Sequence, residues 1–226
     1  MLATRPADVV RVACTADVLE HVELALGDRA DATSIGVLPD RDVEKLARSS
    51  QHEGLVLEAR ARTWVTPHEL ADLLERTQGV AIALDRVRNS YNIGAILRTA
   101  AFFGVDAALL GAPAPHPGLD PNAIRVAEGG VEHLALGRTT DLKDTLSRLR
   151  ARGVKVVGAD GHAEEAAVGF DFGRPAVLVM GNEREGLGPR VRAECDAIVA
   201  IRGSGAIESL NVAVAAGVLV SQLTRR

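Results

Sequence analysis

Two short apolar runs near the carboxyl end of the chain each lead into a glycine-rich loop. Residues 177–180 precede Gly-Asn-Glu-Arg-Glu-Gly-Leu-Gly, and residues 197–201 precede Arg-Gly-Ser-Gly. Short, continuous runs rich in β-branched residues are typical of buried parallel strands. Ligands of open α/β sheets bind where loops leave the carboxyl ends of strands, and glycine lets the backbone approach a ligand closely. We therefore expect a ligand site at the loops after Met180 and Ile201.

A third chemically distinctive segment lies upstream. Residues 92–100 read Asn-Ile-Gly-Ala-Ile-Leu-Arg-Thr-Ala. Ile93, Ile96 and Leu97 follow helical spacing, so this face of a helix should pack on the sheet. Arg98 is a charge among apolar residues. It can pair with a buried carboxylate or extend its guanidinium into water, but we favour a functional role for this arginine.

These three segments together resemble the motifs of the SpoU/TrmH family of RNA ribose 2′-O-methyltransferases, which belong to the SPOUT class. The resemblance lies in residues 92–100, in Gly-Asn-Glu-x-x-Gly-Leu at 181–187 and in Glu-Ser-Leu-Asn-Val-Ala-Val-Ala at 208–215. It implies that S-adenosylmethionine is the cofactor. It also implies a deep trefoil knot, in which the C-terminal helix passes through the loop after Met180.

The resemblance assigns roles to individual residues. Cofactor binding, largely through backbone groups, would fall to Met180, Gly181, Ile201, Gly203 and Leu210. The catalytic and substrate-positioning set would be Asn92, Arg98, Glu183, Ser209 and Asn211. The two cysteines of the chain are expected to be free thiols rather than a disulfide or a metal pair, and no metal is expected in the site.

The implied reaction makes specific demands on these side chains. A ribose 2′-hydroxyl is weakly acidic and must lose its proton as it attacks, so the site must align the reacting atoms and stabilise developing negative charge. Arginine is essentially never deprotonated in proteins. We therefore expect Arg98 to lower the effective pKa of the hydroxyl and hold the adjacent phosphate, while a carboxylate or water accepts the proton.

Simpler structural roles exist for several of these residues. Glu183 can anchor the amides of its own loop, and Asn92, Ser209 and Asn211 are good helix caps. One departure from the family pattern also matters. The family usually has Ile-Pro before the third motif, where this chain has Ile201 and Arg202. Arg202 can crowd the cofactor loop or add a phosphate contact.

Two other functions are considered beside ribosomal RNA ribose methylation. One is a non-catalytic RNA-binding relative whose cofactor pocket Arg202 has impaired, and the other is a transfer RNA ribose methyltransferase. A different nucleotide-binding enzyme lacks support, because the chain has neither a Gly-x-Gly-x-x-Gly turn after the first strand of the larger domain nor a Walker loop.

Charge is unevenly spread over the 226 residues, whose formal net charge is −4. There are 8 basic and 14 acidic residues through Glu75, against 18 basic and 16 acidic residues from Arg76 onward. The second part is therefore the better candidate to meet a phosphate backbone. No apolar run is long enough for a membrane span and no signal pattern is seen, so no membrane partner and a cytoplasmic location are expected.

The pattern of elements predicts an α/β protein with two domains. Residues 1–66 should form a small α/β domain. It resembles the RNA-binding domain that precedes the catalytic domain in several family members, which implies that it binds the RNA substrate, and His52 in it either caps a turn or contacts RNA. Residues 67–226 should form a mostly parallel sheet with helices on both faces, which the resemblance identifies as the knotted methyltransferase domain. In the larger domain, strands are expected at 80–84, 106–110, 134–137, 154–159, 177–180 and 197–201. Helices are expected there at 67–76, 92–103, 122–128, 140–152 and 210–223.

Four further expectations concern partners and the surfaces that meet them. The family completes its sites across a dimer interface, so the resemblance implies a homodimer. The additional N-terminal domain favours ribosomal RNA over transfer RNA as substrate. Residues 111–121 contain four prolines and are a candidate substrate lip. The arginines of the helix at 140–152 are either solvated surface or RNA contacts.

Overall fold

The computed structural model describes residues 1–2, 4–111 and 119–225. The chain divides into two compact units, Met1–Thr63 (unit 1) and Trp64–Arg226 (unit 2). The boundary lies close to the one expected after residue 66. Most of the candidate substrate lip, residues 112–118, lies outside the described residues.

Unit 1 is a three-stranded sheet with two α-helices. The central strand β1 (Val9–Cys14) pairs in parallel with β2 (Ser34–Val37) and antiparallel with β3 (Leu55–Ala59). Helices α1 (Leu19–Leu26) and α2 (Asp40–Ala47) complete the unit. Its small core consists of Val9, Val12, Cys14, Val22 and Leu26.

His52 caps the turn that precedes β3. The backbone amide of Gly54 donates a hydrogen bond of 3.0 Å to His52 Nδ1, and only 6% of the His52 side chain is exposed. The turn-capping role therefore accounts for this histidine, and a direct RNA contact does not.

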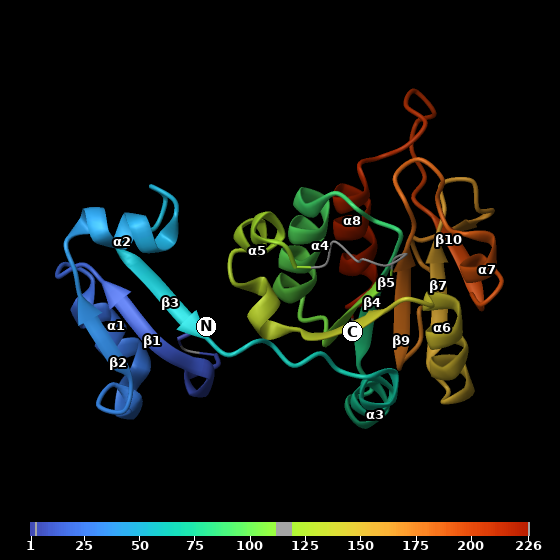
Figure 1. The fold of residues 1–226 in the computed structure, drawn as a ribbon. Helices are drawn as coiled ribbons and strands as arrows, with labels where there is room; N and C mark the ends of the chain where they lie inside the picture. Colours follow the sequence, from blue (N-terminus) through green and yellow to red (C-terminus); the bar gives the residue numbers. More distant parts are fainter. Residues whose placement is uncertain (3, 112–118, 226) are drawn as a thin grey trace. The chain divides into compact units, whose positions relative to one another are not determined.

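Unit 2 contains a seven-stranded sheet in the order β6-β5-β4-β9-β7-β10-β8 (Figure 1). Every strand pairing in it is parallel, which confirms the predicted α/β class. The strands are β4 (Val80–Asp85), β5 (Ala107–Gly111), β6 (Ala135–Thr139), β7 (Lys155–Ala159), β8 (Glu165–Ala166), β9 (Ala176–Met180) and β10 (Ala197–Ala200). Because all these strands run in the same direction, their carboxyl ends lie together at one end of the sheet.

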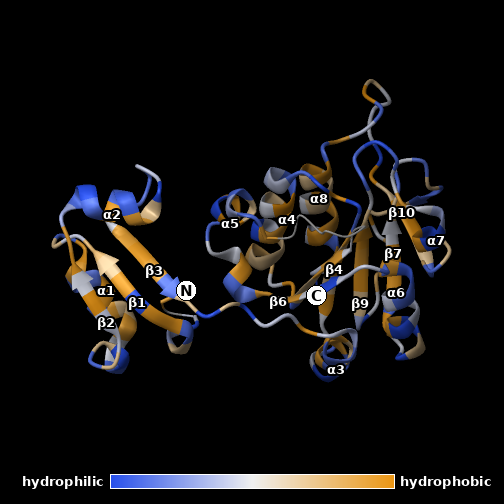
Figure 2. Cartoon of the chain, in the orientation of Figure 1, coloured by the Kyte–Doolittle hydropathy of each residue, from blue (hydrophilic) through white to orange (hydrophobic). Residues whose placement is uncertain are grey.

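Helices cover both faces of this sheet. One face packs against α4 (Ser90–Phe102), α5 (Pro121–Ala127) and α8 (Val212–Leu223). The other packs against α3 (Pro67–Thr77), α6 (Leu142–Ala151) and α7 (Pro189–Arg192). Strands between two helix layers are largely apolar (Figure 2), and β9 consists only of buried apolar residues.

The two edges of the sheet differ in length and cover. Strand β8, at one edge, has only two residues. Beside β6, at the other edge, the Val65 amide donates a hydrogen bond of 2.9 Å to the Leu136 carbonyl. The guanidinium of Arg138, on β6, stands 5.0 Å from the Trp64 ring centre. The segment that opens unit 2 thus lies along the β6 edge.

The arginines of α6 form ion pairs. Arg148 pairs with Asp144 on the same helix. Arg150 pairs with Glu194 and Asp196, and Arg152 pairs with Asp72 and Glu75 of α3. These contacts explain the basic face of α6 without an RNA partner.

Candidate active site

The first glycine loop, residues 181–188, turns sharply at the carboxyl end of β9. Gly181 is buried, and a Cβ at this position would collide with the backbone of Gly186 and Leu187. The Asn182 and Gly186 backbones exchange two hydrogen bonds of 3.0 Å. Met180, the last residue of β9, is buried beneath the loop. Only glycine at position 181 lets the loop close on itself in this way.

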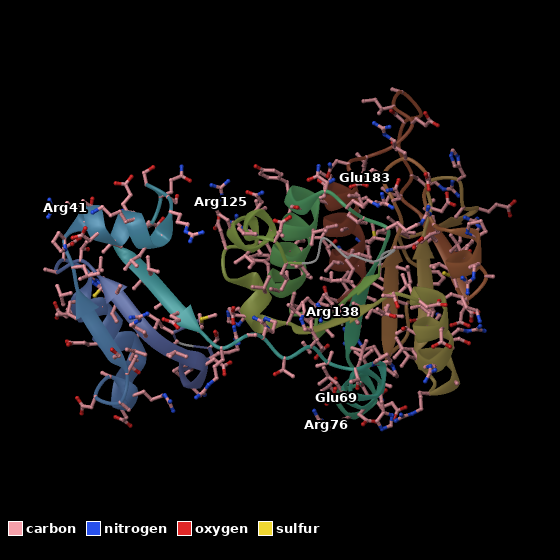
Figure 3. The ribbon with its side chains drawn as sticks, in the orientation of Figure 1. Arg41, Glu69, Arg76, Arg125, Arg138 and Glu183 are labelled. Atoms are coloured by element: carbon pink, nitrogen blue, oxygen red, sulfur yellow. The ribbon has the colours of Figure 1, made fainter. Side chains whose placement is uncertain are left out.

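Asn92, Glu183 and Asn211 are joined by side-chain hydrogen bonds. Asn92 Nδ2 donates to Glu183 Oε1 at 2.7 Å, and Asn211 Nδ2 donates to Asn92 Oδ1 at 3.1 Å. These residues come from the start of α4, the first glycine loop and the start of α8. Helix N-termini favour negative charge, so two of them support the Glu183 carboxylate. Figure 3 shows Glu183 at the end of unit 2 from which the β10–α8 segment projects.

Asn182, rather than Glu183, anchors the amides of the first glycine loop. The amides of Arg184 and Glu185 donate to Asn182 Oδ1 at 2.9 and 3.2 Å. The Glu183 carboxylate is exposed and directed at Asn92 instead. Asn182 therefore has the loop-anchoring role that was considered for Glu183.

The helix caps also differ in part from expectation. Helix α4 begins at Ser90, because Asn89 Oδ1 accepts hydrogen bonds from the amides of Tyr91 and Asn92. Asn92 lies inside the first turn, so the expectation that it caps the helix is wrong. Asn211 does cap α8, and its Oδ1 accepts from the Ala213 amide at 2.8 Å.

Arg98 lies apart from this hydrogen-bonded group. It pairs with Glu128 at 2.6 Å, and the two side chains are 55% and 62% exposed. The partner of Arg98 is therefore an exposed carboxylate and not the buried one that we considered. An exposed ion pair contributes little to stability, so an incoming phosphate can displace Glu128 at low cost.

The second glycine loop, residues 201–211, is exposed from Arg202 onward. It projects away from unit 2 (Figure 1). Ile201 is half-buried at its base, a Cβ added at Gly203 would meet no atom within 4 Å, and Leu210 is largely exposed. In the described part of the chain, Ser209 forms no side-chain hydrogen bond. Among the described residues 203–210, only the Ala206 amide donates a hydrogen bond, to the Ser204 hydroxyl.

These features fit a nucleoside-type cofactor. Unpaired backbone amides and carbonyls, beside an open glycine, can hydrogen-bond neutral groups such as an adenine edge or a ribose. The strands that lead into the two loops, β9 and β10, are separated only by β7. Two interstrand spacings amount to about 10 Å, so one ligand of that size can touch both loops.

Arg202 does not crowd this loop. Its Nη2 donates a hydrogen bond to the carbonyl oxygen of Glu164, in the connection between β7 and β8. This hydrogen bond joins the guanidinium to the connection between β7 and β8. A Cβ added at Gly203 would meet no atom within 4 Å, so the space beside this glycine is open.

Asp85 and Arg86 take part in the site in a way that the sequence did not indicate. Asp85 is 4% exposed and accepts a hydrogen bond of 2.7 Å from the Gly188 amide. Arg86 donates to the Gly186 carbonyl at 3.0 Å. The sequence contained one signal for Asp85: a carboxylate at the end of an otherwise apolar strand is buried and requires a hydrogen-bond partner.

The fold and the site define a class of protein. A parallel α/β sheet carries two glycine loops at the carboxyl ends of its strands, with a group of hydrogen-bonded polar side chains beside them. This is the arrangement of an α/β transferase that binds a nucleoside-type cofactor. Among the described residues, no three His, Cys, Asp or Glu side chains are grouped as a metal site, and no helix there could cross a membrane.

Comparison with known proteins identifies the family. Residues 79–221 match the model of the SpoU rRNA methylase family, and the chain belongs to this family of RNA methyltransferases. It is 31% identical over 226 residues to a protein of Mycobacterium avium (strain 104) named an uncharacterized tRNA/rRNA methyltransferase. That match covers 98% of this chain and 72% of the relative.

Two further proteins resemble the chain along most of its length. The Pseudomonas aeruginosa 23S rRNA (guanosine-2′-O-)-methyltransferase RlmB is 35% identical over 206 residues, which are 90% of this chain and 81% of that protein. The AdoMet-bound rRNA methyltransferase of Sinorhizobium meliloti has the same fold. Its TM-score is 0.76 at 24% identity, with 95% of this chain and 79% of that chain covered.

Proposed function

We propose that this protein transfers a methyl group from S-adenosylmethionine to a ribose 2′-hydroxyl of ribosomal RNA. The observation that carries the proposal is the hydrogen-bonded group of Asn92, Glu183 and Asn211 beside the open second glycine loop. The activity for which the RlmB relative is named, guanosine 2′-O-methylation of 23S rRNA, supports the ribose position and the ribosomal substrate.

The chain's own residues would orient the hydroxyl and accept its proton. Asn92, which accepts a hydrogen bond from Asn211, donates to one oxygen of the Glu183 carboxylate, and the exposure of this side chain leaves the other oxygen free for a substrate hydroxyl. Glu183 is thus a suitable proton acceptor, by a hydrogen bond within normal reach. Arg98 would exchange Glu128 for the adjacent phosphate and stabilise the developing oxyanion. Ser209 would contact the same ribose from the second glycine loop.

The cofactor would be held by Met180, Gly181, Ile201, Gly203 and Leu210. Once bound, S-adenosylmethionine supplies a methyl group on a sulfonium that is already a good leaving group. The reaction therefore needs in-line alignment more than acid catalysis. The two glycine loops supply this alignment by fixing the cofactor against Glu183.

We further propose that unit 1 binds the RNA substrate. Helix α2 and the residue that follows it present the exposed side chains of Arg41, Lys45 and Arg48 (Arg41 is labelled in Figure 3). Arg41 and Lys45 pair with Asp42 at this surface, and an RNA phosphate would compete with that carboxylate. Phosphate contacts of this kind make affinity fall with salt. Replacing Arg41 and Arg48 by glutamine should weaken RNA binding and flatten its salt dependence, and an unchanged salt dependence would contradict the proposal.

A homodimer and a knot complete the proposal. Phe102 of α4 is 83% exposed and Val214 of α8 is 54% exposed, and these two helices pack side by side (Figure 1). A second copy of the chain would bury such an apolar face. Phe102→Glu should then give a monomer in sedimentation analysis, and an unaltered mass would contradict this. The packing of α8 against α4 and β9 supports the predicted trefoil knot.

Calorimetric titration with S-adenosylmethionine and its demethylated product is the first test. Binding by the wild-type protein supports an active methyltransferase. The second test incubates the protein with 23S rRNA or transfer RNA transcripts and maps resistance to alkaline cleavage, which a 2′-O-methyl group confers. Methylation of 23S rRNA that Glu183→Gln reduces sharply, to a low residual rate, supports the full proposal, and methylation of transfer RNA alone changes the substrate. Absence of both binding and methylation would favour a non-catalytic RNA-binding relative.

A further inference from the structure

Several regions of the molecule were candidates for a further role. The hollow near the end of α6 is bordered by Arg150 and Asp196, which already pair with each other. Cys195 is a lone thiol with no second feature beside it. The contacts between the carboxyl end of β4 and the first glycine loop are different, because they connect a buried charge, a strained arginine and the candidate catalytic carboxylate.

We propose that Asp85 and Arg86 are positioning residues, which fix the conformation of the first glycine loop and thereby the place of Glu183. This inference rests on the proposed function, because it assumes that Glu183 acts on the substrate and that the loop contacts the cofactor. Neither Asp85 nor Arg86 needs to touch the substrate in this role.

Asp85 holds the far end of the loop. It ends β4, between β5 and β9, and is buried. Its Oδ2 accepts the Gly188 amide at 2.7 Å and faces Arg86 Nε at 3.4 Å. A buried carboxylate without such partners is strongly disfavoured. The Gly188 amide is therefore held in place as firmly as the carboxylate itself.

Arg86 holds the loop at three further points. Its Nη2 donates to the Gly186 carbonyl at 3.0 Å, and its Nη1 pairs with Glu185. Its own carbonyl accepts a hydrogen bond of 3.0 Å from Asn182 Nδ2. Asp85 and Arg86 together thus hold the loop near both of its ends.

The backbone of Arg86 shows that this arrangement is demanding. Its φ is +58°, in the left-handed region that glycine adopts readily and other residues avoid. This conformation lets the carbonyl meet Asn182 while the guanidinium reaches Gly186 and Glu185. Glycine would adopt the turn without strain but would lose both guanidinium contacts.

Glu183 lies between the two held ends. Asn182 is fixed through the Arg86 carbonyl and in turn accepts the amides of Arg184 and Glu185. The backbone of Glu183 is therefore constrained on both sides, and its carboxylate meets Asn92 at 2.7 Å. Releasing the loop would leave the carboxylate free to move away from Asn92.

The test compares Arg86→Lys with Arg88→Lys. Lysine keeps the charge but cannot make the forked contacts. Arg88 is exposed and, among the described residues, has no side-chain partner, so it is the matched control. We expect Arg86→Lys to lower kcat about tenfold or more and to weaken cofactor binding severalfold, since small misplacements of reacting groups have such effects. Arg88→Lys should leave kcat and cofactor binding within about twofold of the wild type.

A second comparison separates positioning from general damage. In a Glu183→Gln background, Arg86→Lys should lower kcat no further, because the group that it positions is already inactive. Glu185→Gln removes one contact only and should give a smaller loss of kcat, with the melting temperature unchanged. The proposal is overturned if Arg86→Lys behaves like Arg88→Lys, or if it lowers kcat equally in both backgrounds.

Hydrogen exchange keeps this test independent of the proposed function. If the wild-type protein transfers no methyl group, the proposed function fails. In that case the amides of Gly186 and Gly188 should still exchange faster in Arg86→Lys than in Arg88→Lys. Equal exchange in the two variants would refute the positioning role itself.

Discussion

Asn211 has two separable functions in the structure, and substitution can divide them. Its Oδ1 caps α8 by accepting from the Ala213 amide, and its Nδ2 donates to Asn92. Asn211→Ala removes both contacts. Loss of a cap costs about 1 kcal/mol, and loss of a hydrogen bond of this kind costs about 1 kcal/mol more. The free energy of unfolding should therefore fall by roughly 2 kcal/mol.

Asn211→Ser removes only the amide donor, because serine is a good cap. Its free energy of unfolding should lie about 1 kcal/mol above that of Asn211→Ala. For a domain of this size, 1 kcal/mol corresponds to about 2–4 °C in melting temperature. Scanning calorimetry of the two variants should resolve this difference. Methyl transfer, in contrast, should fall about tenfold or more in both variants, because neither orients Asn92 toward Glu183.

Two results would refute this reasoning. If Asn211→Ser melts together with Asn211→Ala, the cap does not stabilise α8. If Asn211→Ser retains wild-type turnover, the hydrogen bond to Asn92 has no part in the reaction. Cofactor binding by both variants, measured by calorimetry, is the control that the second glycine loop is intact.

Three further predictions concern stability and reactivity. Ile96, on α4, is fully buried. Ile96→Ala should therefore lower the free energy of unfolding by about 2–5 kcal/mol in urea titrations, and a loss below about 1 kcal/mol would contradict this packing. The Ser90 hydroxyl and the Ala123 amide lower the pKa of Asp120 from 3.8; its stabilising effect is present above that value and is lost as the pH falls toward the lower folded pKa. Asp120→Asn should therefore reduce the acid sensitivity of unfolding, and identical pH profiles would oppose this. Burial raises the pKa of the Cys195 thiol to about 11, so iodoacetamide should leave it unmodified at pH 8 until the protein is denatured.

The order of strands and helices in unit 2 was largely predictable from sequence. Apolar runs such as residues 177–180 mark buried strands whatever their neighbours, and the predicted helix at 67–76 corresponds closely to α3. The two-residue β8 was not predicted, because so short a strand has no periodicity. Its pairing depends on β10, which lies more than thirty residues further along the chain.

The site residues that belong to sequence motifs could be predicted, whereas those whose role depends on the three-dimensional fold could not. Asn92, Glu183 and Asn211 were proposed from the family resemblance, and the structure brings their side chains within hydrogen-bond distance. The role of Arg86 depends on a positive φ and on a loop almost one hundred residues away. Neither can be inferred from an arginine in a polar segment.

The edges of the seven-stranded sheet have a consequence for self-association. A long open edge presents unpaired amides and carbonyls on which another chain can add a strand. Strand β8 is too short for this, and Val65 donates a hydrogen bond to the Leu136 carbonyl beside β6. A chain shortened to begin at Pro67 would keep every strand of the sheet but expose the β6 edge. We expect such a chain to fold and then to aggregate through β6, so that the residues just before α3 protect the solubility of unit 2.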